Sequence, residues 1–323
     1  YYNGLNMFVL RQINSKITTT FVSMSMLCLM LFLAISAFAT GSGLASSVKT
    51  DLEDMTKFDY TFYGVSEKGY QEEQQQKFMK RLDALGLTIE KDAKEILPIT
   101  IYQNGTFRKC RYKMEPLLKG REKYSDYTKD YVKKLYEIPL TFAKLSEYNK
   151  IRKAIGEKEL TLKSDEYILN CDYGNLIPIM EKAASDKQKL TLDGKTYKMK
   201  YGLQKDTYMV TAAKTDMGTV ILNDKIIQSL KIDYSTLYLN INWKGNAQKA
   251  SKHYNEHLKQ MIANSKMKNS PYSATFSKEE VYEQSTGLST IMTYIAIYIG
   301  LVFLITCAAV LALQQLSENA DNI

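Results

Sequence analysis

Two long stretches without a charged residue constrain this chain more than any other feature. No Asp, Glu, Lys, Arg or His occurs between Ile17 and Val48, and none occurs between Gln284 and Ser317. A helix that crosses a bilayer needs about 20 predominantly apolar residues, and both stretches exceed that length. We therefore expect a membrane protein in which two transmembrane α-helices, at 17–44 and 285–313, flank one extracytoplasmic α+β domain at 45–284.

The segments outside the two predicted spans indicate which way the chain faces. An even number of spans places both termini on one side, and Arg11 and Lys16 lie close to the first span. Positive residues beside a span favour the cytoplasm, so we expect cytoplasmic termini, an extracellular middle domain and a location in the cell membrane. Residues 1–16 then form a cytoplasmic or interfacial helix, or simply extend the first span. Residues 314–323 begin a cytoplasmic coupling region.

A cleavable signal peptide is the alternative interpretation of the first stretch. Positive residues precede it, and Ala37-Phe38-Ala39 resembles a cleavage site. The apolar run from Phe21 to Thr40 is, however, longer than the roughly 7–15 residues of such a peptide. The sequence also begins at Tyr1 rather than Met, and we expect it to be a segment of a longer polypeptide.

Each predicted span contains two small residues four positions apart. These are Ala37 and Gly41 in the first span, and Ala296 and Gly300 in the second. Pairs of this kind allow helices to approach closely in lipid. They predict contact between the spans, although small residues are common enough in such helices to recur by chance.

The charged and tyrosine-rich part of the chain is the middle domain. The stretch from Lys49 to Glu283 holds 41 of the 43 Lys and Arg and 33 of the 35 Asp and Glu, so its net charge is +8. Such a surface favours anionic partners such as lipid head groups, pyrophosphates or wall polymers, or is a solvated basic surface without a partner. The domain also holds 20 tyrosines, which suit binding surfaces but also occupy half-buried strand and helix positions.

Residue periodicity predicts a mixture of helices and strands in this domain. The Asp193-Gly194 dipeptide, between alternating strands, is typical of a two-residue β-hairpin turn. We expect helices at 70–85, 124–135 and 246–267, the last leading towards the membrane, strands at 97–102 and 237–243, a turn at Asn104-Gly105 and a hairpin at 190–201.

The strongest catalytic pattern in the sequence is a pair of histidines. His253 and His257, with Glu256 between them, match the H-x-x-E-H pattern of inverted zinc peptidases. A catalytic zinc site needs a third protein ligand, and the downstream candidates are Glu279, Glu280 and Glu283. Both histidines flank an apolar helical stripe, so we interpret them as part of a polar helix face.

The remaining motifs indicate a protein that is not an enzyme. The chain contains no phosphate-binding G-x-x-x-x-G-K-[ST] loop, no G-x-G-x-x-G and no C-x-x-C. We expect no catalytic residues, no cofactor, no metal and no nucleic-acid partner, and the sequence leaves the ligand-binding residues unidentified. Cys110 and Cys171 both lie in the middle domain, and they form either one disulfide or two free thiols.

Three segments resemble a known family. The entry GLNMFVLRQINSKITTTFVSMSMLCLMLF and the exit ALQQLSENADNI resemble the chain around the large extracellular domain of FtsX-like ABC-transporter permeases, in the bacitracin- and lantibiotic-type branch. Within the domain, IPLTFAKLSEYNKIRKAIGEKELTL, from Ile138 to Leu162, resembles a recurring strand, Ser-x-Tyr-Asn, helix and Gly of the same branch. Together these segments cover about a quarter of the sequence.

The resemblance implies a permease that works with a separate ATPase subunit. Such a complex handles peptide antibiotics or frees their anionic lipid-pyrophosphate targets, and some members signal through a sensor histidine kinase. The large domain would then capture or sense the ligand. Two alternatives remain: the sensor region of a two-span receptor, such as a chemoreceptor or histidine kinase, and an FtsX-type regulator of cell-wall hydrolases.

Overall fold

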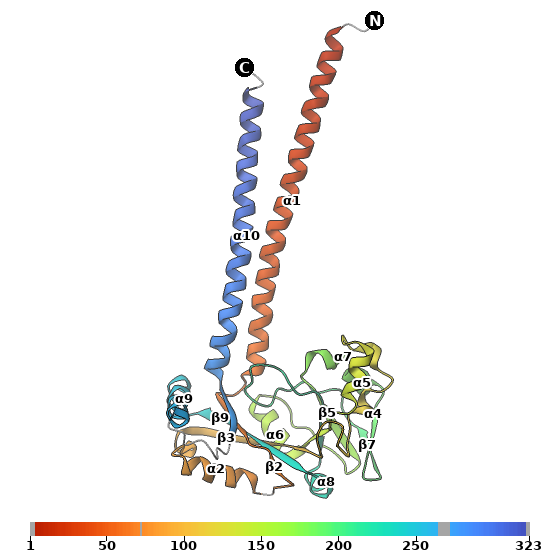
Figure 1. The fold of residues 1–323 in the computed structure, drawn as a ribbon, viewed down its shortest axis with the longest axis vertical. Helices are drawn as coiled ribbons and strands as arrows, with labels where there is room; N and C mark the ends of the chain where they lie inside the picture. The colour runs from red at the N-terminus through yellow and green to blue at the C-terminus, as the bar shows by residue number, and fades with distance from the viewer. Residues whose placement is uncertain (1–3, 72, 264–271, 321–323) are drawn as a thin grey trace. The chain divides into compact units, whose positions relative to one another are not determined.

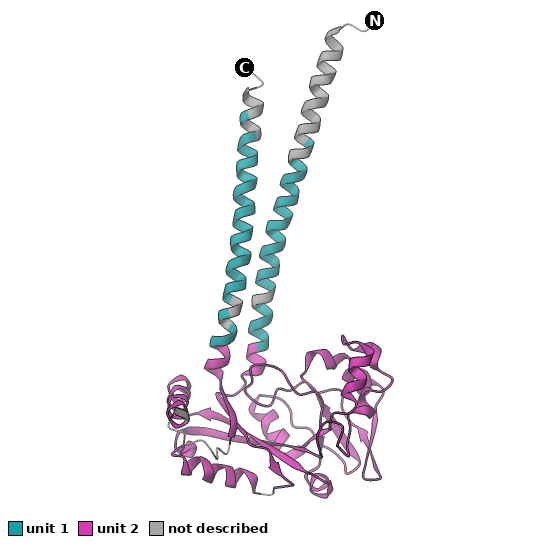
Figure 2. Ribbon diagram, in the orientation of Figure 1, with its two compact units in different colours: residues 1–51, 283–323 teal, residues 52–282 magenta. Residues whose placement is uncertain are grey.

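The structure, a computed structural model, describes residues 4–71, 73–263 and 272–320. It divides into two compact units, shown in different colours in Figure 2, and each is described by itself. We call residues 1–51 with 283–323 the helical unit, and Leu52–Tyr282 the sheet domain.

The helical unit contains the greater part of each of two long helices. Helix α1 (Gly4–Met55) is continuous, so the first described residues extend the same helix as the predicted span. Helix α10 (Lys278–Ala320) returns antiparallel to it (Figure 1). By length and composition, Met24–Met55 and Lys278–Leu313 are apolar enough to cross a membrane.

Small residues form the contact between these two helices. A Cβ added to Gly41 would lie only 2.5 Å from the Cβ of Ala296, and one added to Gly300 would lie 3.6 Å from the carbonyl oxygen of Ala34. Gly41 and Gly300 are both buried. The predicted helix contact is therefore confirmed, with Ala34, which belongs to neither predicted pair, taking part in it.

The sheet domain is built on a mixed sheet of ten strands. Its order is β10-β1-β9-β3-β4-β8-β5-β7-β6, and β2 pairs with the end of β9. Two neighbouring pairs, β4 with β8 and β5 with β7, are parallel, and the other pairs are antiparallel. The strands are β1 (Tyr60–Gly64), β2 (Glu67–Lys68), β3 (Ala93–Gln103), β4 (Thr141–Lys144), β5 (Glu166–Asn170), β6 (Lys189–Leu192), β7 (Lys195–Met199), β8 (Thr219–Leu222), β9 (Tyr234–Trp243) and β10 (Tyr272–Ser277).

Short helices cover the two ends of this sheet. Helices α2 and α9 lie at one end, and α4, α5 and α7 gather at the other (Figure 1). Their bounds are α2 (Gln74–Ala84), α3 (Ile89–Asp92), α4 (Glu115–Leu118), η1 (Glu122–Tyr124), α5 (Lys129–Leu135), α6 (Leu145–Ala154), η2 (Gly174–Leu176), α7 (Ile177–Ser185), α8 (Asp224–Ser229) and α9 (Ala247–Ala263).

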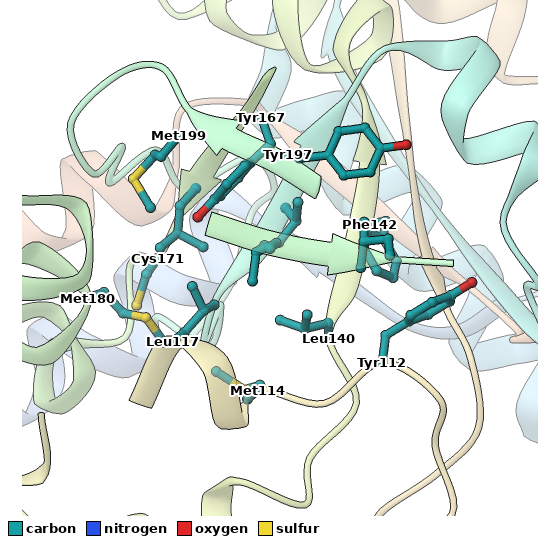
Figure 3. Close-up of a cluster of buried hydrophobic side chains, with 14 of the residues drawn as sticks. Tyr112, Met114, Leu117, Leu140, Phe142, Tyr167, Cys171, Met180, Tyr197 and Met199 are labelled. Carbon is teal, nitrogen blue, oxygen red and sulfur yellow. The ribbon is translucent and has the colours of Figure 1, made fainter. Parts of the chain in front are cut away.

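Each end of the domain has its own hydrophobic cluster. Cluster 1 joins strands β4, β5, β7 and β8 to α4, α5 and α7, and Figure 3 shows Cys171 there beside Met180 and Leu117. Cluster 2 joins β1 and β9 to α2 and α9, where the rings of Trp243 and Tyr254 stack at 4.6 Å. Burying a large apolar side chain contributes about 1.5–3 kcal/mol, so both ends are held by their cores.

Several predicted elements are confirmed. The hairpin of β6 and β7 turns at Asp193 and Gly194, whose φ angles of 48° and 80° suit the two-residue turn. Strand β9 buries Leu237, Leu239 and Ile241 on one face, as its alternation predicts. The predicted strands at 97–102 and 237–243 correspond to β3 and β9, and the strand and helix of 138–162 correspond to β4 and α6.

Two predicted helices begin later than expected, and a third is confirmed over its described part. At 70–85, α2 begins only at Gln74. At 124–135, α5 begins only at Lys129, because the hydroxyl of Thr128 accepts from the amide of Tyr131 and caps the helix there. The helix at 246–267 is α9, whose described part ends at Ala263, and 264–267 lie outside the described residues. It does not lead directly into the second span, because strand β10 intervenes.

The chain enters and leaves the sheet domain at one place. Strands β1 and β10 are antiparallel neighbours, with Tyr60 opposite Ser277. The amide of Lys278 donates a hydrogen bond to the carbonyl oxygen of Asp59 at 2.9 Å. The residue before the first strand is therefore bonded directly to the residue after the last.

Candidate anion-binding pocket

A basic pocket in the sheet domain lies where β2, β9 and the turn after β3 meet. Its volume is about 470 Å³, within the usual range for small-molecule sites. Three segments that are far apart in sequence contribute to it. The lining residues are Lys68, Gly69, Gly105, Thr106, Lys109, Ile232, Asp233 and Tyr234.

Main-chain hydrogen bonds hold the strand side of the pocket. The amide of Gly69 donates a hydrogen bond to the carbonyl oxygen of Asp233 at 2.7 Å. The amide of Asp233 in turn donates to the carbonyl oxygen of Gln103 at 3.0 Å. Lys68 pairs with Tyr234 in the β2–β9 ladder. The backbone at this wall is therefore fixed by paired groups, which places the Lys68 side chain at the pocket.

The opposite wall is a tight turn, Thr106–Lys109. The amides of Thr106 and Lys109 donate to each other's carbonyl oxygens, at 3.1 and 2.9 Å. Gly105 before it has a φ of 78°, and a Cβ there would collide with Lys109 and lie 2.7 Å from the Cα of Cys110. Only glycine fits this position, so the predicted Asn104-Gly105 turn has a steric reason.

Two polar side chains fasten this turn to the rest of the domain. The amide nitrogen of Asn104 donates to the carbonyl oxygen of Lys231 at 2.6 Å, and its oxygen accepts from the amide of Arg111 at 2.8 Å. In the β6–β7 hairpin, the carboxylate of Asp193 accepts from Arg111 and from the hydroxyl of Tyr112, both at 2.6 Å. The chain on either side of the turn is therefore held by the segment before β9 and by the hairpin.

Positive charge outweighs negative charge around the pocket. Lys68 and Lys109 line it, and neither forms an ion pair with another residue that the structure describes. Arg108 and Lys231 are the chain neighbours of lining residues, while Asp233 supplies one carboxylate. Two ammonium groups on a rigid frame with a threonine hydroxyl and a tyrosine can bind an anion such as a phosphate.

A second pocket of about 470 Å³ lies between α6 and the β8–α8 turn. Its carboxylate, Asp224, already accepts from the amide of Ser146 at 3.2 Å and from its hydroxyl at 2.5 Å. Lys225 is the one basic residue among those that line it. This pocket is therefore less suited to an anion than the one at Lys68 and Lys109.

Two buried carboxyl groups, Asp172 and Asp216, lie at the segment Tyr201–Gly218, which connects β7 to β8 in the chain. Asp172 accepts from the hydroxyl of Thr207 and from the amide of Asp216, both at 2.8 Å. The carboxyl of Asp216 accepts from Asn170 and from Thr219. Burial raises the pKa of Asp216 to about 7 and also raises the pKa of Asp172. These groups hold the segment on the sheet.

The same segment reaches the last turn of α1 within the sheet domain. The amide of Thr211 donates to the carbonyl oxygen of Met55 at 3.1 Å, and Lys214 lies 3.4 Å from the carboxylate of Asp54. The amide of Val210 donates to the hydroxyl of Thr61 at 2.8 Å. Tyr201–Gly218 therefore connects β5, β1 and the end of α1 by hydrogen bonds.

The histidine pair lies on α9 without converging on other ligands. His253 is exposed, and Nε2 of His257 is 3.4 Å from the carbonyl oxygen of Leu85. The helix buries Tyr254, Leu258 and Met261, which is the apolar stripe expected beside a polar face. Among the described residues, no three His, Cys, Asp or Glu side chains form a group that could hold a metal, so the structure does not assemble the glutamates at 279, 280 and 283 with the histidines.

All four cysteines lie in the described part of the chain, and all are free thiols. Cys171 is buried in cluster 1, where burial raises the pKa of its thiol. Cys110 is half-buried, with its sulfur 3.6 Å from the carbonyl oxygen of Glu137. Of the two states left open by the sequence, the structure has the unpaired one.

Comparison with known proteins adds little to this picture. No family model matches the sequence, and no curated protein matches it. A similar solved structure is that of a "Putative Lipoprotein from Bacillus anthracis", at 12% identity and a TM-score of 0.34. The match covers 67% of this chain and 95% of that chain. A likeness this weak supports no argument about the site.

One sequence feature pointed to the pocket. The Asn104-Gly105 dipeptide predicted a turn, and that turn forms one wall. Lys68 and Lys109 could not be singled out, because 43 Lys and Arg are spread along the chain. Their meeting depends on pairing between β2, β3 and β9.

Proposed function

We propose that this chain is part of a membrane-anchored permease whose extracytoplasmic domain binds an anionic, phosphate-bearing amphiphile. The main support for the proposal is the pocket lined by Lys68 and Lys109, whose backbone is held by hydrogen bonds. A phosphate group accepts several charge-assisted hydrogen bonds, and these are stronger than neutral ones. The net charge of +8 between Lys49 and Glu283 would attract such a ligand towards the domain.

The anchoring part of the proposal rests on α1 and α10. Both are long and apolar enough to cross a membrane, and they pack through small residues. If these helices are spans with cytoplasmic termini, as Arg11 and Lys16 favour, the sheet domain lies outside the cell membrane. The resemblance to FtsX-like permeases supplies the rest of the proposal: a separate ATPase subunit as the partner, a lipid-pyrophosphate or the peptide antibiotic bound to it as the ligand, and a sensor histidine kinase as a further partner.

Titration calorimetry on the full chain in detergent tests the ligand. Farnesyl pyrophosphate serves as a soluble lipid-pyrophosphate, with farnesol and inorganic sulfate as comparisons. We expect farnesyl pyrophosphate to bind most tightly. The preference over sulfate should remain at about 0.5 M salt, where the Debye length is only about 4 Å.

A double substitution locates the binding. Lys68→Ala with Lys109→Ala should weaken binding at least about tenfold, since hydrogen bonds to charged groups are each worth about 1.5–3 kcal/mol. The matched control removes two exposed lysines of α9, by Lys249→Ala with Lys259→Ala, and should leave the affinity nearly unchanged. Equal weakening by both pairs would mean a diffuse basic surface and would contradict the pocket. Tight binding of a free peptide antibiotic without farnesyl pyrophosphate binding would favour peptide capture.

A further inference from the structure

Exposed tyrosine rings are confined to one part of the sheet domain. The structure describes all 20 tyrosines of this domain. Only Tyr124 and Tyr131 are exposed, with 38% and 45% of their surface accessible to solvent. Tyr127 and Tyr173 lie half-buried beside them. We call these four residues the tyrosine patch. It belongs to the lobe of η1, α5 and α7, and it shares no residue with the pocket at Lys68 and Lys109.

The tyrosine patch is held in place by its own contacts. The rings of Tyr127 and Tyr131 lie 4.5 Å apart, and the hydroxyls of Tyr127 and Tyr173 are 2.5 Å apart. The side-chain amide of Asn175 donates to the hydroxyl of Tyr127 at 2.9 Å. Tyr127 and Tyr173 also pack against cluster 1. A ligand therefore meets rings that are already ordered, which lowers the entropic cost of binding.

Lysines lie beside the ring of Tyr124. The ammonium of Lys123 lies 5.1 Å from the ring centre of Tyr124, and that of Lys182 lies 5.9 Å from it. Lys182 is already paired with Asp186 at 2.6 Å, whereas Lys123 forms no ion pair with another described residue. Exposed Lys129 follows in the first turn of α5. Acidic residues lie in the same segment: Asp126 and Asp130 are exposed, and Asp130 is 3.8 Å from Lys133. From Arg121 to Leu135 there are five basic and three acidic residues, so the segment has an excess of two positive charges, which favours an anionic ligand.

We propose that the tyrosine patch binds an anionic glycan. The exposed faces of Tyr124 and Tyr131 cover the C–H face of a sugar ring, which removes apolar surface from water. The Tyr173 hydroxyl and the Asn175 amide bond sugar hydroxyls, while Lys123 and Lys129 pair with acidic groups along the strand. The tyrosine patch has four residues, whereas a standard protein interface has about 20–30 residues on each side. A patch of this size suits a narrow polymer better than a folded protein.

Titration of the full chain in detergent with two oligosaccharides tests this proposal. The probes are a hyaluronan hexasaccharide, which carries carboxylates, and chitohexaose, which is neutral. The hyaluronan fragment should bind more tightly. Tyr131→Ala should lower the affinity for both oligosaccharides about tenfold or more. Tyr131→Phe should retain the affinity, because the ring remains. Lys123→Ala should remove only the preference for the charged probe.

Exposed residues elsewhere in the domain provide the controls. Val65→Ala shortens another exposed apolar side chain, and Lys153→Ala removes another exposed lysine, and neither should change either affinity. Thermal unfolding of Tyr131→Ala should match the wild type, because that ring is exposed. No binding of either oligosaccharide would overturn the proposal, as would unchanged affinity in Tyr131→Ala. A poly-glutamate peptide that binds the patch and is not displaced by the hyaluronan fragment would also overturn it and would indicate a peptide surface.

Discussion

The amide of Asp216 donates a hydrogen bond to the carboxylate of Asp172 at 2.8 Å, so two buried acidic residues from distant parts of the chain lie next to each other. Both belong to the network that fastens Tyr201–Gly218 to the sheet. Their proximity, together with burial, makes the ionised forms costly, and burial is the larger of these causes. The stability of the sheet domain should therefore depend on pH.

The expected dependence follows from the raised pKa of Asp216. Its folded value of about 7 lies above the unfolded value of about 3.9, so the folded state holds the proton between these limits. The contribution of Asp216 to the free energy of unfolding should then be largest below about pH 4 and should fall by about 1.4 kcal/mol per pH unit up to about pH 7. Asp216→Asn should flatten this slope in urea unfolding, while Asp126→Asn, at an exposed position, should keep it. An unchanged slope in Asp216→Asn would assign the effect to another group.

Gly105 should tolerate substitution less well than another glycine of similar conformation. Gly105 and Gly120 have φ angles of 78° and 80°, but a Cβ on Gly120 would meet no atom within 4 Å. Gly120→Ala should cost about 1–2 kcal/mol, because the left-handed region disfavours a Cβ. Gly105→Ala should cost at least about 1–3 kcal/mol more, because the turn must move. Unfolding curves measure the difference, and equal costs would mean that the turn is not rigid.

Cross-linking tests the contact between the two long helices. With Cys28 and Cys307 replaced by Ala, Gly41→Cys and Ala296→Cys should form a disulfide under mild oxidation, since their Cβ positions are in contact. Gly43→Cys with Ala296→Cys should cross-link much more slowly, because a Cβ on Gly43 meets no atom within 4 Å. Equal rates for the two pairs would show that the helices do not pack in this register.

Thiol labelling from outside intact cells tests the proposed orientation. In a Cys110→Ser chain, cysteines introduced at the exposed positions Lys153 and Lys163 should react with a membrane-impermeant maleimide. Cysteines at Gln12 and Asn319 should react only after permeabilisation. The reverse pattern would place the sheet domain in the cytoplasm and would remove the basis for an extracytoplasmic ligand.

Local patterns in the sequence predicted those parts of the fold that are determined locally. The β6–β7 hairpin was predictable because Asp193-Gly194 and the flanking alternation lie within a few residues. Strand β10 was missed, although Tyr272 to Ser277 contains aromatic and Thr residues, because its partner β1 lies more than 200 residues away in sequence. Among the tyrosines, sequence did not separate the buried Tyr148 from the exposed Tyr131, because both occupy helices with mixed neighbours.

The site was less predictable than the fold. The pocket requires Lys68, Lys109 and Asp233 to meet, and these residues belong to three separate parts of the chain. Long-range strand pairing brings them together, and no short motif records it. The tyrosine patch is similar, since Tyr127 meets Tyr173 through packing on cluster 1.

The hydrogen bond between Asp59 and Lys278 means that the sheet domain is an insert in a helical hairpin. Neighbouring strands are about 4.8 Å apart, a gap that a two-residue turn can close. Replacing the whole sheet with such a turn would leave α1 and α10 joined directly. A different domain whose ends also meet on neighbouring strands could be grafted onto the same two helices. The sheet domain can therefore be exchanged as one unit while the sequences of α1 and α10 stay constant.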